Sequence, residues 1–91
     1  MCNDAPGDNM RTMKADRQRV NMATRIAAVT RIAISKPITA DAATVVGFAQ
    51  YHYALRNYWK TIQACALAMK MLQGDDLTWQ DEAILNQIKN S

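Results

Sequence analysis

Apolar side chains recur at alternating steps of four and three residues through the middle of the chain, and this spacing constrains the fold most. The series runs through Phe48, Tyr51, Leu55, Tyr58, Ile62, Cys65, Met69 and Leu72, with Thr44 one step before it. Such spacing lines one side of an α-helix and is typical of a coiled-coil seam or of the core stripe in a helical hairpin. It predicts one helix over residues 39–73, capped by Thr39 or Asp41 and ended by Gly74.

Two further helical patterns flank this segment. Residues 9–34 contain no glycine or proline, and Pro37 ends this helix because proline disfavours helical backbone at the residue before it. Thr78, followed by Asp81 three residues later, is a weak form of the capping box. The pair predicts the start of a short helix over residues 78–89.

The scarcity of turn residues argues against a sheet. The 91 residues include three glycines and two prolines, too few for the turns of an all-β chain. We therefore predict an all-α fold, a long antiparallel helical hairpin plus a short C-terminal helix, forming a small helical bundle. Residues 1–8 are predicted as a flexible tail and residues 9–91 as a single helical domain.

The predicted central helix is apolar on two sides. Opposite the first series lie Val46, Tyr53, Ala64, Leu67, Ala68 and Met71. A helix of this length spans about 50 Å, and the two remaining helices cannot cover both of its sides. Self-association is the economical way to bury the rest, so we predict a homo-oligomer. The residues predicted for the interface, whether between subunits or with a partner protein, are Val46, Tyr53, Trp59, Leu67 and Met71. The reverse arrangement stays open, with the Phe48–Leu72 series between subunits.

Basic residues gather on the predicted first helix. The net charge is +3, with +4 on residues 1–36 and −1 on residues 37–91. One half of the helix carries Arg11, Lys14, Arg17, Arg25 and Arg31; the other half is apolar, through Val20, Ala23, Ala27, Thr30 and Ile34, with Met22, Ile26, Val29 and Ala33 beside them. Lysine and arginine release counterions when they meet phosphates. We therefore predict binding to nucleic acid or to a nucleic-acid-processing complex, with Arg56 and Lys60 as further contacts; an acidic protein surface is the alternative partner.

Two other interpretations stay open. Four of the six aromatic residues lie between Tyr51 and Trp59, and the face around Tyr53, Arg56 and Trp59 suits a protein-protein adaptor or inhibitor. A helix-turn-helix DNA-binding regulator would instead use Gly47 as its turn glycine. Its second helix would present Gln50, His52, Arg56, Asn57 and Lys60 to base edges. The apolar series, however, passes through Gly47 without a break in phase.

Catalytic and metal-binding patterns are absent from the sequence. One histidine, His52, and two distant cysteines, Cys2 and Cys65, give no zinc spacing. No glycine-rich phosphate loop and no nucleophile beside a base occur, so we expect no enzyme, cofactor, metal or small-molecule substrate. We find neither a signal peptide nor a transmembrane run, and the first helix lacks the large apolar anchors of membrane-surface helices. Sparse cysteines indicate a reduced, cytoplasmic protein.

Overall fold

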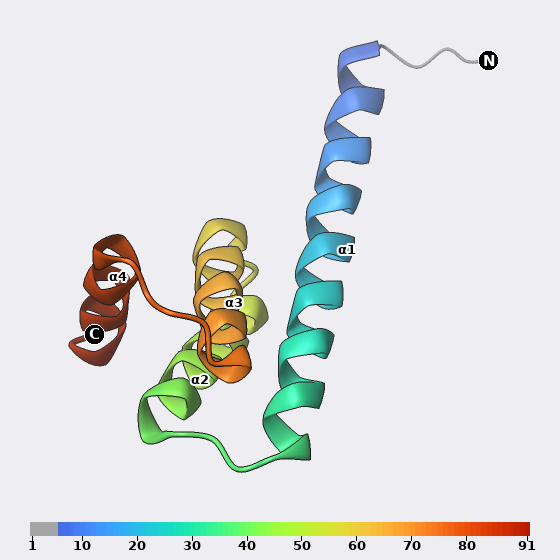
Figure 1. Ribbon diagram of the computed structural model, residues 1–91. Helices are drawn as coiled ribbons and strands as arrows, with labels where there is room; N and C mark the ends of the chain where they lie inside the picture. The colour runs from blue at the N-terminus through green and yellow to red at the C-terminus, as the bar shows by residue number, and fades with distance from the viewer. Residues whose placement is uncertain (1–5) are drawn as a thin grey trace.

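Four α-helices make up the protein in a computed structural model that describes residues 6–91, with side chains from Lys14 onward (Figure 1). They are α1 (Pro6–Ser35), α2 (Ala40–Ala54), α3 (Tyr58–Gln73) and α4 (Trp79–Lys89), and the described chain contains no strand. The predicted all-α class is confirmed. α1 begins at Pro6, earlier than predicted, because the fixed φ of proline suits the first helical position. Residues 1–5 of the predicted tail lie outside the described residues.

Three predicted helix boundaries are confirmed by their capping contacts. The Thr39 hydroxyl accepts from the backbone N–H of Ala42 at 3.1 Å and begins α2. Gly74 follows α3 with φ 78°, the left-handed conformation that glycine adopts without a Cβ penalty. Lys36, in the connection between α1 and α2, donates from Nζ to the carbonyl of Leu72 at 2.5 Å and so satisfies one of the last carbonyls of α3.

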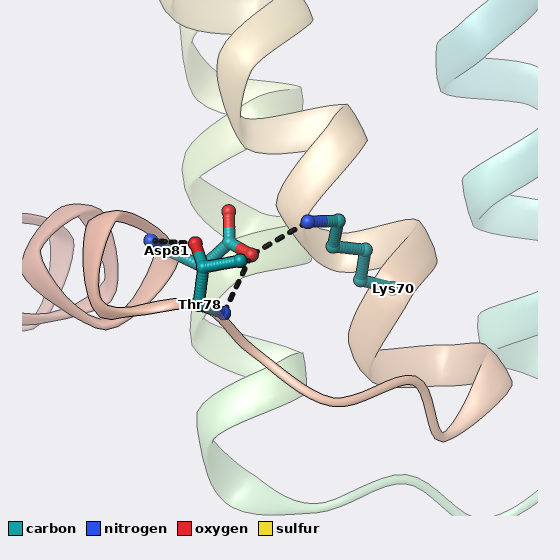
Figure 2. A network of polar contacts seen from close by, with 3 residues as sticks. All are labelled: Lys70, Thr78 and Asp81. Carbon is teal, nitrogen blue, oxygen red and sulfur yellow. Dashed lines mark hydrogen bonds and ion pairs between the residues drawn. The ribbon is translucent and has the colours of Figure 1, made fainter.

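The third boundary, at α4, also ties that helix to α3 (Figure 2). Asp81 Oδ2 accepts from Lys70 Nζ at 2.6 Å and from the Thr78 backbone N–H at 3.1 Å. The Thr78 hydroxyl accepts from the Asp81 N–H at 3.1 Å, which completes a capping box. The hydrogen bond from Lys70, aided by the Thr78 amide, lowers the pKa of Asp81 below its ordinary value. The capping box and an ion pair therefore share one carboxylate.

The continuous helix predicted over residues 39–73 is wrong, because a tight turn at residues 55–57 divides it into α2 and α3. Arg56 has a left-handed φ of 61°, and the Asn57 side chain caps α3 by accepting from the Lys60 N–H at 3.3 Å. The physical reason is apolar burial. Folded back on itself, the segment packs α2 against α3 and covers surface that one long helix would leave in water.

The core is centred on the α2–α3 pair. Its buried side chains are Ala42, Val45, Val46 and Ala49 from α2, and Ala64, Cys65, Leu67, Ala68 and Leu72 from α3. The many alanines let the two helices approach closely, and α1 adds Val29 while α4 adds Ile88. Thr61 is the one fully buried polar side chain among the described residues, and its hydroxyl donates to the Asn57 carbonyl at 2.7 Å. The core is therefore apolar with its polar exception satisfied.

Of the apolar half predicted for α1, the side that carries Met22, Ile26 and Val29 packs on the other helices, and the arc from Val20 to Ile34 does not. Met22 and Val29 are buried, whereas Val20 and Ile34 are 65% and 80% exposed. Ala23 and Ala27 of the predicted arc are also exposed. Thr30 is half-buried, and its hydroxyl accepts a hydrogen bond from Gln50 Nε2. The chosen stripe has the larger side chains, Met22, Ile26 and Val29, which bury more apolar area than alanines do.

The first half of α1 projects beyond the other helices (Figure 1). The radius of gyration is 15.8 Å, against about 12 Å for a compact domain of this length. The molecule measures 53 × 27 × 22 Å along its principal axes. Its long dimension follows from α1, whose 30 residues extend about 45 Å.

Candidate nucleic-acid interface

The predicted basic residues of α1 lie at the surface. Lys14, Arg17, Arg25 and Arg31 are exposed, and the Arg11 side chain lies outside the described side chains. At 100° per residue, Lys14, Arg17 and Arg25 fall within a sector of about 80° on the helix. We call these three residues the α1 basic sector. Arg31 lies about 40° beyond it and roughly 9 Å further along the axis than Arg25.

A polar contact orients the α1 basic sector toward the start of α3. Asn21, at the middle of the sector, donates from Nδ2 to the Tyr58 hydroxyl at 2.7 Å. Arg25 in turn donates from Nε to Asn21 Oδ1 at 3.2 Å. The sector therefore adjoins the turn at residues 55–57. The role of Asn21 could not be predicted from the sequence, because an asparagine on a helix carries no signal of a partner 37 residues away.

The acid nearest the sector along the chain is already paired. Asp16 accepts from Arg19, three residues later on the same helix, and both side chains are largely exposed. On the helical wheel this pair lies away from the sector, on the opposite half of α1. Neither Lys14, Arg17 nor Arg25 forms an ion pair with another described side chain. Among the side chains from Lys14 onward, none neutralises the three positive charges of the sector.

The turn between α2 and α3 presents aromatic and apolar side chains. Tyr51, Leu55 and Trp59 are 62%, 57% and 74% exposed. The Arg56 guanidinium lies 5.4 Å from the centroid of the Tyr53 ring, within the range of a cation–π contact. Arg56 is exposed and lies two residues before Tyr58, the residue of α3 that accepts a hydrogen bond from Asn21 of α1.

Lys60 does not join the other predicted contacts. It lines a cavity together with His52 of α2 and Ile88 of α4, on the side of α3 that faces α4. The predicted set of seven basic contacts is therefore divided between two faces. The sequence pattern placed Arg56 and Lys60 on one helix, whereas the turn separates them. Whether either residue contacts a partner stays a prediction.

The predicted oligomer interface is also divided. Val46 and Leu67 are 7% and 2% exposed because they pack inside the chain. They offer no surface to a partner, and this part of the prediction is wrong. Tyr53 and Met71 are half-buried, and Trp59 is exposed. The homo-oligomer itself stays a prediction.

The helix-turn-helix with its turn at Gly47 is not formed. Gly47 lies inside α2, and a Cβ added there would meet nothing within 4 Å. The local backbone is helical, so Gly47 is neither a turn nor a close-approach residue. The only non-glycine residue with positive φ among those described is Arg56, nine residues later.

Two described titratable side chains of α2 and α3, His52 and Cys65, have shifted pKa values. Burial lowers the pKa of His52, with a smaller contribution from Lys60 in the same direction. Burial raises the pKa of the Cys65 thiol, and Arg25 opposes part of that change. Within the described residues, no three histidine, cysteine, aspartate or glutamate side chains gather in a group that could hold a metal ion.

No helix in residues 6–91 has both the length and the apolar character needed to cross a bilayer.

Comparisons with known proteins add neither a family nor a relative. No family model, no curated protein and no solved structure matches this chain.

Proposed function

We propose that this protein is a non-catalytic module that binds nucleic acid through the α1 basic sector. The observation that supports it is the exposure of Lys14, Arg17 and Arg25 within one sector, with no carboxylate of a described residue paired to them. Arg56 adds an exposed positive charge in the turn before Tyr58, the residue that Asn21 of α1 contacts. Lysine and arginine in such a group bind phosphates and release counterions.

The spacing of the sector suits a phosphate backbone. From Lys14 to Arg25 the sector spans about 16 Å of helix. One strand of a duplex presents a phosphate about every 3.4 Å along its axis, so the sector can follow about five of them. Contacts of this kind fix the position of the protein without reading the base sequence. Little sequence preference is therefore part of the proposal.

The test is fluorescence anisotropy with short labelled DNA and RNA, single-stranded and duplex, across a salt series. The unmodified chain should bind at low salt, and its affinity should fall steeply as salt rises. The variant Lys14→Gln with Arg17→Gln should flatten the log–log salt slope by about 1.5, at about 0.7–0.9 for each contact removed. Both side chains are exposed, so the thermal stability should stay nearly constant.

A matched control removes the same charge elsewhere. Lys60→Gln with Lys89→Gln also lowers the net charge by two, but both residues lie outside the α1 basic sector. This control should keep the slope of the unmodified chain. The proposal fails if neither DNA nor RNA binds at low salt, or if the control loses as much binding as the sector variant.

A second candidate function is docking on another protein through the α2–α3 turn. The observation that favours it is the exposure of Tyr51, Leu55 and Trp59 beside Arg56, because aromatic and arginine side chains are enriched at the centres of interfaces. The same salt series separates the two candidates. If the chain binds neither DNA nor RNA at low salt, docking on a protein through this turn becomes the preferred function.

A further inference from the structure

A cavity of about 510 Å³ lies between α2, α3 and α4, away from the α1 basic sector. Its size falls within the range of about 300–1,000 Å³ that is usual for small-molecule sites. It forms because α4 packs mainly against α2, while its first turn is held by Lys70 of α3. The three helices therefore meet around an open space rather than a filled core.

One wall of the cavity is aromatic. The rings of Phe48 and His52 lie 4.3 Å apart by centroid, tilted by 52°, and the Tyr51 ring meets His52 edge-on at 5.1 Å. From α4, Ile84 and Ile88 line the cavity as well. Aromatic faces and aliphatic side chains together favour a ligand with a flat apolar ring.

The polar groups of the cavity favour an anion. Lys60 brings a positive charge, and Gln63 brings an amide that can donate a hydrogen bond. Among the described side chains that line the cavity there is no aspartate or glutamate. A carboxylate on the ligand would therefore meet a cation and an amide donor at Lys60 and Gln63. Ser91, which also lines the cavity, adds the main-chain carboxylate with which the described chain ends, so the ligand carboxylate is expected on the Lys60 side.

His52 supplies a second and independent observation. Its Nδ1 is buried and has no hydrogen-bond partner among the described residues. Burial lowers the pKa of this imidazole, so the ring is neutral near pH 7 and can carry its proton on Nδ1. Buried polar atoms in folded proteins are normally satisfied. Nδ1 is covered from solvent, so a ligand oxygen in the cavity becomes its partner only when the imidazole turns toward the cavity.

We propose that the cavity binds a small aromatic carboxylate, with its ring against Phe48, Tyr51 and His52 and its carboxylate toward Lys60. The sequence carries no signal for this site, because its walls come from three helices whose arrangement depends on the turn at residues 55–57. The proposal does not rest on nucleic-acid binding, since the cavity and the α1 basic sector share no residue.

The test uses naphthoate as the anionic probe and naphthalenemethanol as its neutral counterpart. Binding to the full chain is followed by calorimetry and by amide chemical shifts in ¹H–¹⁵N NMR spectra. Naphthoate should bind more tightly than the alcohol, with shifts concentrated at residues of the cavity such as His52 and Ile88. Absence of binding at millimolar naphthoate, or shifts centred elsewhere, would overturn the proposal.

Two variants with equal loss of charge complete the test. Lys60→Met should weaken naphthoate by about fivefold or more and leave the alcohol unchanged, because a charged partner roughly doubles the strength of a hydrogen bond. Lys89→Met removes a lysine of α4 that pairs with Asp41 at 3.3 Å and should change neither affinity. Equal effects of the two substitutions, or no effect of Lys60→Met, would refute the role of the cavity cation.

Discussion

The left-handed conformation of Arg56 gives the sharpest test of the fold. Replacing Arg56 by glycine or by alanine removes the same cation–π contact with Tyr53, so the difference between the two variants reports the backbone alone. A left-handed φ costs an L-residue about 1–2 kcal/mol, and the greater freedom of glycine in the unfolded chain returns about 0.4–1 kcal/mol. We expect the glycine variant to be more stable by about 0.5–1 kcal/mol.

The sign of this difference distinguishes the turn from a continuous helix. In the interior of a helix, alanine is more stable than glycine by about 1 kcal/mol. Thermal unfolding followed by circular dichroism resolves the two cases, because about 1 kcal/mol moves the Tm of a domain this size by about 4–8 °C. If the Tm of Arg56→Ala equals or exceeds that of Arg56→Gly, the turn at residues 55–57 and the packing of α2 against α3 that depends on it are refuted.

Three further predictions use the same unfolding measurements. Gly47→Ala should stabilise the chain by up to about 1 kcal/mol, because Gly47 is helical with open space around it. Gly74→Ala should destabilise the chain by about as much, because the φ of Gly74 is 78°. The lowered pKa of Asp81 makes its bond to Lys70 stabilising above the ordinary aspartate pKa, with that contribution lost as pH falls through the lower value of the folded state. Asp81→Asn should therefore flatten the acid side of the stability profile, and an unchanged profile would contradict the assigned ion pair. Leu67→Ala should lower the free energy of unfolding by about 2–5 kcal/mol without changing the mass measured by ultracentrifugation, since Leu67 is a core residue. A changed mass with unchanged stability would show instead that Leu67 lies in an interface between subunits.

The boundaries that could be predicted from the sequence are those that rest on local chemistry. Thr39, Gly74 and the Thr78–Asp81 capping box act within a few residues of themselves, and each does so in the structure. The break at Arg56 could not be predicted in this way, because arginine is uncommon in the left-handed region and the apolar spacing runs through it. Asn57 was the available signal, since asparagine is among the preferred N-cap residues.

The candidate site follows the same division. The exposure of Lys14, Arg17 and Arg25 follows from a helical wheel, and the structure agrees. The separation of Lys60 from Arg56, and the burial of Val46 and Leu67, depend on which faces of α2 and α3 meet. That choice is made by long-range packing, which a one-helix interpretation of residues 39–73 cannot represent.

The attachment of α4 has a consequence for dynamics. This helix contributes one buried side chain, Ile88, and its start is held by the contacts of Asp81. Detaching it exposes far less apolar surface than opening the α2–α3 pair, so its amide hydrogens should exchange with solvent through a local opening of lower free energy. Because Ile84 and Ile88 line the cavity, the cavity is complete only while α4 is docked. A ligand bound in the cavity favours the molecules in which α4 is docked. As its concentration rises, amide exchange should therefore slow in α4 first and in the other helices only later.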